Sequence, residues 1–192
     1  MQTIEQVSKR LSSDPNWFNK CMLGVVFSII PVAHFVAFGY LYRLFVQGRA
    51  QRDISLSDWG DWKGMFVDGL KLFLIVLLFG IIPVALMSAL VGLSPWDSVF
   101  VKIPMAPVLF FAVPLPSAAL YLYLLNEDFK NCFNFQALVG LMKAGIHAYW
   151  VPTIAYIGLM FMLPFTYFAG GIIYFYLMGN VFKNLEREAD RG

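Results

Sequence analysis

The sequence predicts an all-α protein embedded in a membrane, and two observations lead to this prediction. Of the 192 residues, 59% are hydrophobic and only 14% are charged, whereas about 25% are charged in an ordinary soluble domain. The charges are also segregated, because residues 21–42, 72–96, 103–126 and 144–182 contain no Asp, Glu, Lys or Arg. A helix needs about 20 apolar residues to cross the hydrocarbon core of a bilayer, so each run is long enough to span it.

These runs divide the chain into a single membrane domain, residues 21–182, between a polar N-terminal surface helix (1–20) and a charged C-terminal tail (183–192). We expect membrane spans at about 21–45, 70–92, 103–125 and 149–182, and interfacial helices at about 56–70 and 133–148. The order span, amphipathic helix, span then occurs twice. This order suggests two related halves, an arrangement common in membrane proteins.

The first predicted interfacial helix has a clear apolar face. Trp59, Trp62 and Phe66 recur at steps of three and four residues, and Asp61 and Asp68 lie on the opposite side. Residues 133–148 repeat this design. Helices of this kind lie at the boundary between lipid headgroups and acyl chains, and each runs directly into a predicted span.

Prolines interrupt the apolar runs. Pro31, Pro83 and Pro114 fall within the first three runs, and Pro152 and Pro164 fall within the last. Each proline removes a backbone donor and clashes with the preceding helical turn. The prolines therefore indicate either discontinuous helices around a site, or re-entrant hairpins that enter and leave the same face of the membrane at Pro31 and Pro164.

The distribution of Lys and Arg leaves the topology open. In a four-span arrangement seven of these residues lie on each side, so the positive-inside rule does not fix the orientation. If the first and last runs are hairpins, thirteen Lys and Arg residues lie on one side of the membrane and only Lys102 lies on the other. Against this arrangement, a hairpin in the first run leaves only about ten residues per arm, and its turn must be shielded from lipid.

Aromatic residues near the ends of the runs are candidate interfacial anchors, because Trp and Tyr concentrate at headgroup depth. The candidates are Trp17, Tyr40, Tyr42, Trp59, Trp62, Trp96, Trp150, Tyr174 and Tyr176. His34 is the one ionisable side chain well inside a run, which makes it a possible intramembrane polar site. A structural role for His34 is the favoured interpretation, because few other polar residues accompany it.

Reactive chemistry has little support in the sequence. It contains no phosphate-binding loop, no His-Glu-x-x-His and no Gly-x-Ser-x-Gly motif. The acidic pairs Asp58 with Asp61 and Glu127 with Asp128 are interpreted as helix caps. We expect no enzymatic activity, no cofactor and no metal site, and the net charge of +2 gives no reason to expect a nucleic-acid partner.

Several stretches resemble the family of prokaryotic polytopic membrane proteins grouped as domain of unknown function 4013. These are Gly39-Tyr40-Leu41-Tyr42-Arg43, Trp59-Gly60-Asp61-Trp62, Phe66-Val67-Asp68-Gly69-Leu70-Lys71, Phe133-Asn134-Phe135 and residues 176–182. The similarity covers most of residues 20–185 and is most specific around Trp-Gly-Asp-Trp. The resemblance implies a polytopic fold in a bacterial or archaeal cell membrane. It implies no activity and no functional residue.

Three functions remain as hypotheses. The leading one is a non-enzymatic, structural or accessory subunit that organises a membrane patch or a larger complex, as a homo-oligomer or with a partner. The alternative is a small oligomeric transporter or channel with broken helices at Pro31, Pro83 and Pro114 around a central path. A lipid-modifying enzyme would require Asp61, Asp68 and His147 to converge at headgroup depth.

Overall fold

The computed structural model describes residues 3–93, 103–160 and 164–189, and these residues form helices without any β-strand. In chain order the elements are α1 (Ile4–Ser12), α2 (Trp17–Ile29), α3 (His34–Arg49), α4 (Trp62–Val76), the π-helix η1 (Leu77–Ile81), α5 (Ile82–Leu93), α7 (Met105–Phe111), α8 (Pro114–Asn126), the 3-10 helix η2 (Phe129–Phe133), α9 (Phe135–Met160) and α10 (Pro164–Ala189). The prediction of an all-α fold is confirmed for this part of the chain.

Helix starts follow local capping chemistry, and this corrects two predicted boundaries. The carboxylate of Asp61 accepts a hydrogen bond from the backbone N–H of Gly64, so the helix expected from residue 56 begins at Trp62, with Trp59 in the preceding loop. Residues 1–20, predicted as a polar surface helix, hold α1 up to Ser12 and the start of α2 at Trp17, and between them Asp14 accepts a hydrogen bond from the backbone N–H of Asn16. Glu127 ends α8 with a φ of 54°, so it is not at a helix start as expected.

Three of the prolines have effects on the backbone that differ from one another. Pro31 separates α2 from α3, and Val32 beside it has a φ of 71°. Before Pro83 the helix widens into η1, where the N–H of Ile82 donates to the carbonyl of Leu77. A wider turn gives room for the pyrrolidine ring, which would otherwise clash with the carbonyl four residues earlier. Pro152 lies inside the continuous helix α9, so the break expected there is absent.

The elements α4, η1 and α5 form one continuous helix of 32 residues, Trp62–Leu93, which is long and apolar enough to cross a membrane. The predicted amphipathic helix and second span therefore join as expected. A second candidate is the pair α7 and α8, which bend by 41° at their junction. The first apolar run divides into α2 and α3, each shorter than the roughly 20 residues that a crossing needs. Four spans remain a prediction.

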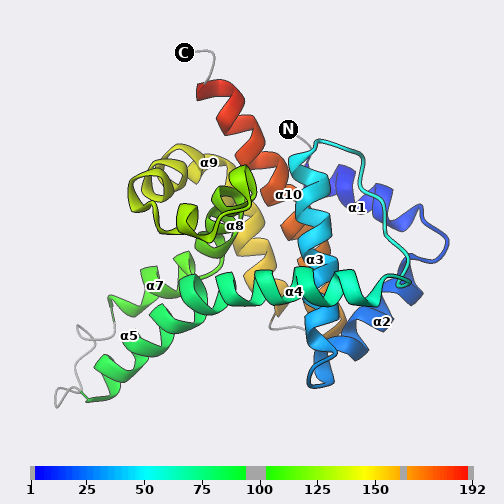
Figure 1. Cartoon of the computed structure of the whole chain (residues 1–192), viewed down its shortest axis with the longest axis horizontal. Coiled ribbons are helices and arrows are strands. Elements are labelled where there is room, and N and C mark those ends of the chain that lie inside the picture. The colour runs from blue at the N-terminus through cyan, green and yellow to red at the C-terminus, as the bar shows by residue number, and fades with distance from the viewer. Residues whose placement is uncertain (1–2, 94–102, 161–163, 190–192) are drawn as a thin grey trace.

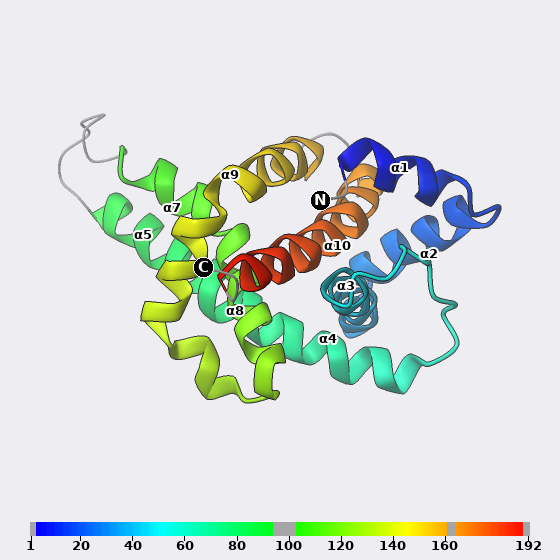
Figure 2. The same ribbon diagram turned by 90° about the horizontal axis from the view of Figure 1, so that it is seen from above.

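Two helix pairs fold back on themselves at the ends of the chain. Figure 1 shows α2 descending to the break at Pro31 and α3 rising from it, and α9 and α10 make a similar reversal before Pro164. Figure 2 shows the same reversal of α9 and α10 from above. The two returning helices, α3 and α10, lie against each other in the centre of the molecule, and α4 runs across α3.

Glycines allow α3 to approach both neighbours closely. A Cβ at Gly39 would overlap the backbone carbonyl of Met65, and one at Gly69 would overlap the carbonyl of Phe35, so α3 and α4 are in backbone contact. Gly48 and Gly179 form the same kind of contact between α3 and α10. Small residues commonly permit such approaches between membrane helices. No equivalent glycine contact joins α8 and α9 in the described residues, so the two predicted halves differ in their packing.

The helices α5 and α7 form an arm that extends from this core. They lie beside each other, and neither has a buried residue. The most apolar window of the helix Trp62–Leu93 is only 17% buried inside the chain. Leu86, Leu90 and Leu93 of α5 are 62%, 65% and 82% exposed. The arm therefore presents a continuous aliphatic surface to its surroundings.

Candidate functional site

A cavity of about 250 Å³ lies where the broken helices meet. Phe38 and Leu41 of α3 form one wall, Val113 at the α7–α8 junction forms another, and Tyr156 and Tyr174 approach from α9 and α10. We call this space the central cavity. Ile81 of η1 and Pro116 of α8 also line it, so the irregular backbone expected near Pro83 and Pro114 does surround a common space.

The polar groups of the central cavity are hydroxyls that bind protein. The Tyr174 hydroxyl lies 3.1 Å from the carbonyl oxygen of Val113, to which it donates, and it accepts from Ser117 Oγ at 3.3 Å. The ring of Tyr174 stacks on that of Tyr156 with centroids 4.7 Å apart. The Tyr174 hydroxyl is therefore paired with protein groups, and the remaining lining is mainly hydrocarbon, which suits an apolar occupant better than an ion or a sugar.

His34 lines a smaller cavity of about 100 Å³ with Ser28 and Tyr167. This cavity adjoins the central one, because Phe38, Leu41 and Tyr167 line both. The His34 ring packs against the rings of Phe38 and Phe73, with centroids 5.8 and 5.9 Å away. Within the described residues no group of three His, Cys, Asp or Glu side chains could hold a metal ion. Among the described residues that line this smaller cavity, His34 is accompanied by the hydroxyl groups of Ser28 and Tyr167 and by no Asp, Glu, Lys or Arg.

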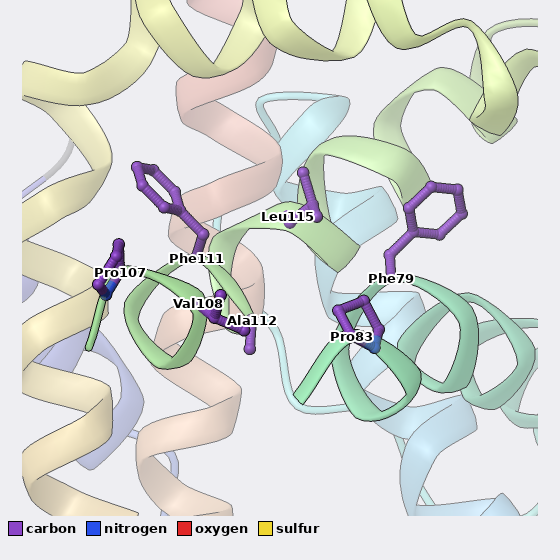
Figure 3. A pocket seen from close by; sticks show the side chains of 7 residues that line it. All are labelled: Phe79, Pro83, Pro107, Val108, Phe111, Ala112 and Leu115. Carbon is purple, nitrogen blue, oxygen red and sulfur yellow. The ribbon is translucent and has the colours of Figure 1, made fainter. Parts of the chain in front are cut away.

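An open groove lies on the other side of the α7–α8 junction. Its first part, about 210 Å³, lies between Phe79 and Pro83 on one side and Phe111 and Leu115 on the other (Figure 3). Its second part, about 380 Å³, continues from Phe111 and Leu115 to α9. We call these two parts together the α7–α9 groove. Among the described residues, Lys143 is the one charged residue that lines either part.

The acidic residues considered for lipid chemistry are engaged in ion pairs. Arg43 Nη2 lies 2.6 Å from Asp61 Oδ2, and Arg43 Nε lies 3.1 Å from Asp68 Oδ2. The hydrogen bond from Arg43, aided by the N–H of Gly64, lowers the pKa of the Asp61 carboxyl. His147 is exposed on α9, and this helix lies apart from the start of α4 in both views (Figures 1 and 2). The three residues do not converge, so the condition set for a lipid-modifying enzyme is not met.

The aromatic candidates divide into two groups by burial. Tyr40, Tyr42, Tyr174 and Tyr176 are between 0% and 7% exposed and pack inside the protein. Tyr176 donates its hydroxyl to the carbonyl oxygen of Arg52 at 2.7 Å. A ring that is surrounded by side chains does not reach a lipid headgroup. These tyrosines therefore join helices to one another.

Of the four tryptophans in the described residues, two are exposed and two are half-buried. Trp62 is 49% exposed and Trp150 is 48% exposed, so both can contact the surroundings of the protein. Trp17 is half-buried at the start of α2. Trp59 stacks on the ring of Tyr40, with centroids 4.4 Å apart. Trp96 lies outside the described residues.

A polar network near the C-terminal ends of α3, α8 and α10 was missed by the sequence analysis. Arg49 donates to the carbonyl oxygen of Leu124 at 2.7 Å, and its guanidinium lies over the ring of Tyr121. The Tyr121 hydroxyl donates to Glu186 Oε2 at 2.5 Å, and Glu186 also pairs with Lys183. The hydrogen bond from Lys183, followed by that from Tyr121, lowers the pKa of Glu186. Basic residues near helix C-termini were the available signal.

The comparisons with known proteins identify a family. A family model described as "Protein of unknown function (DUF4013)" matches residues 22–175. Searches of curated proteins and of solved structures find no significant match. The matched region includes the glycine crossing of α3 with α4, the arm and both cavities. The chain belongs to the domain of unknown function 4013 family.

Proposed function

We propose that this chain is a non-enzymatic, multi-pass protein of a prokaryotic cell membrane that acts as a structural or accessory subunit of a membrane patch or larger complex. The carrying observation is the exposed aliphatic arm, since α5 has no buried residue although all its residues except Ser88 are apolar. Exposed apolar surfaces of this extent serve lipid or protein contact. Of the acidic residues considered for lipid chemistry, Asp61 and Asp68 are both engaged by Arg43.

We further propose the hairpin topology, in which only the helix Trp62–Leu93 and the α7–α8 pair cross the membrane. The reversals at Pro31 and before Pro164 support it, as does the thirteen-to-one division of Lys and Arg that it gives. Positive residues concentrate on the cytoplasmic side of membrane proteins. Both termini and the α3–α4 loop then lie in the cytoplasm, and residue 94 lies outside.

Labelling of single cysteines with a membrane-impermeant maleimide in intact cells distinguishes the two topologies. The variants are S55C, S94C and Q136C, and C21 and C132 are first replaced by alanine. In the hairpin topology only S94C is labelled before the cells are opened. In the four-span topology position 94 also lies on the opposite side of the membrane from positions 55 and 136, so these three variants alone do not distinguish the two arrangements. The C-terminus lies on the same side as position 94 only in the four-span topology. A cysteine at Gly192 therefore decides between them, and its labelling together with S94C contradicts the hairpins.

The accessory role is tested by crosslinking from the arm. A photoreactive residue at Leu90 should form a protein adduct in native membranes, with a second copy of the chain or with another membrane protein. The matched control carries the same photoreactive amino acid in place of Lys63, which is exposed near the start of α4. Adducts with lipid alone from Leu90, Leu86 and Leu93 would overturn the proposed subunit role.

Transport remains the alternative, because broken helices do surround the central cavity. The largely hydrocarbon lining weighs against a polar substrate. Liposomes that contain only this protein should show no solute flux above protein-free liposomes. Flux that H34A abolishes would favour transport and overturn the non-transporting role.

A further inference from the structure

The α7–α9 groove has the dimensions and lining of a ligand site. Its larger part, about 380 Å³, falls by itself within the roughly 300–1,000 Å³ of typical small-molecule sites. Val139, Met142 and Ile146 form its α9 wall, and Phe111 and Leu115 connect it to the smaller part. Val139 and Ile146 are 48% and 41% exposed, so the apolar wall is open to the surroundings.

In the part of the chain that the structure describes, Lys143 supplies the one charge at this groove. It is exposed and has no ion pair within residues 3–93, 103–160 and 164–189. By contrast, Lys20 lies 3.2 Å from both Asp14 and Asp58, and Arg43 is held by two carboxylates. His147 follows Lys143 by four residues and is also exposed, so both face the same side of α9.

The other polar group in the groove is already occupied. Tyr149 is fully buried, and its hydroxyl donates to the carbonyl oxygen of Met142 at 2.9 Å. A hydrocarbon chain therefore meets no unsatisfied donor or acceptor along the groove. An anionic group is favoured only near Lys143, which lines the groove and is exposed.

We propose that the α7–α9 groove binds an acyl chain of an anionic phospholipid, with the headgroup phosphate paired with Lys143. This inference rests on the proposed membrane location. An ammonium group that lines an apolar channel distinguishes anionic from zwitterionic lipids through the net charge of the headgroup, whereas the groove wall accepts the chain of either.

Native mass spectrometry of the full chain in a neutral detergent measures this preference. The protein is titrated with phosphatidylglycerol and with phosphatidylcholine that carry identical acyl chains. We expect one phosphatidylglycerol to bind at roughly tenfold lower concentration than phosphatidylcholine, as one charge-assisted contact implies. Equal occupancy by the two lipids would overturn the proposal.

Two sets of variants locate the site. K143Q should abolish the preference and K143R should retain it, whereas K63Q, which removes an exposed charge from α4, should leave it unchanged. V139W should fill the groove and reduce binding of both lipids at least tenfold, whereas L86W on the arm should not. Equal effects of K143Q and K63Q, or undiminished binding by V139W, would place the lipid elsewhere and overturn the proposal.

Two further measurements keep the result interpretable. Melting temperatures in the same detergent identify a variant that has unfolded, and I146W on the same wall then replaces V139W. Glycerol phosphate, which has no acyl chain, should not displace phosphatidylglycerol; complete displacement would show that the groove is not needed. Crosslinking from Leu90 does not depend on Lys143, so failure of the lipid site and failure of the proposed subunit role are distinguishable.

Discussion

Helices α3 and α5 are both rich in apolar residues, yet they occupy opposite environments. Nine of the sixteen residues of α3 are buried, whereas none of the twelve residues of α5 is. In α3 the apolar residues include Gly39, Gly48, Tyr40 and Phe45, which permit close backbone approach and fill space between helices. In α5 they are mainly aliphatic. Hydrophobicity alone therefore does not distinguish a helix that packs against protein from one that faces the proposed bilayer.

The largest effect is expected where α3 and α4 are in backbone contact. G69L should destabilise the fold by about 3 kcal/mol or more, because its side chain would overlap the carbonyl of Phe35 and neither backbone can yield cheaply. G92V is the matched control, since a Cβ at Gly92 in the arm meets nothing within 4 Å. Thermal unfolding in detergent measures both, and equal losses would contradict the contrast between core and arm.

A charge in the arm should affect insertion but not the core. L86K should disfavour membrane insertion by about 3 kcal/mol, the cost of a lysine at the centre of a spanning helix. An insertion assay with glycosylation sites measures this change. The same variant in detergent should unfold at nearly the wild-type temperature, since Leu86 is 62% exposed. A large loss of stability in detergent would show that the arm packs against the core.

A smaller effect is expected at a buried hydroxyl. Y176F should lower the free energy of unfolding by about 1 kcal/mol, because it removes the hydrogen bond to the carbonyl oxygen of Arg52. Y42F is the control, since the structure gives the Tyr42 hydroxyl no hydrogen-bond partner among the described residues. In denaturant unfolding, Y176F should have a lower free energy of unfolding than Y42F. The reverse order would contradict the role assigned to Tyr176.

The smallest effect concerns Glu186 and depends on pH. The pKa of Glu186 is lowered in the folded protein, so its contribution to stability is present above its unfolded value of 4.5 and is lost as the pH falls through the folded pKa. E186Q should therefore lower the free energy of unfolding by less than about 1 kcal/mol at neutral pH. It should also make the melting temperature fall less steeply as the pH is lowered. Unchanged acid sensitivity in E186Q would contradict this assignment.

Features of the fold that depend on local chemistry were predictable from the sequence. The breaks at Pro31 and Pro114, and the passage of the first amphipathic segment into a long apolar helix, follow from proline geometry and hydrophobic period. Pro152 was misjudged, because a helix can continue past a proline when neighbouring groups accommodate the lost hydrogen bond. Trp59 was placed on a helix because its spacing fits, but Asp61 caps the helix after it.

The site was less predictable, because it depends on contacts between distant segments. A tyrosine at the end of an apolar run has the same local pattern whether it meets headgroups or another helix, and Tyr40 and Tyr176 turned out to be buried. The contacts of Arg49 and Glu186 with Tyr121 join residues that are far apart in the chain. His34 was singled out as a possible intramembrane polar site, and this stays a prediction; the cavity beside it follows only from the packing.

The two glycine contacts of α3 also have a mechanical consequence. Gly39 and Gly48 are nine residues apart, so at 100° per residue they lie on opposite sides of the helix. Their contacts with α4 and α10 place backbone directly against backbone on both sides, without an intervening layer of deformable side chains. Sliding of α4 along α3, or of α3 along α10, is therefore sterically restricted at these two crossings, and we expect the three helices to behave as one rigid unit.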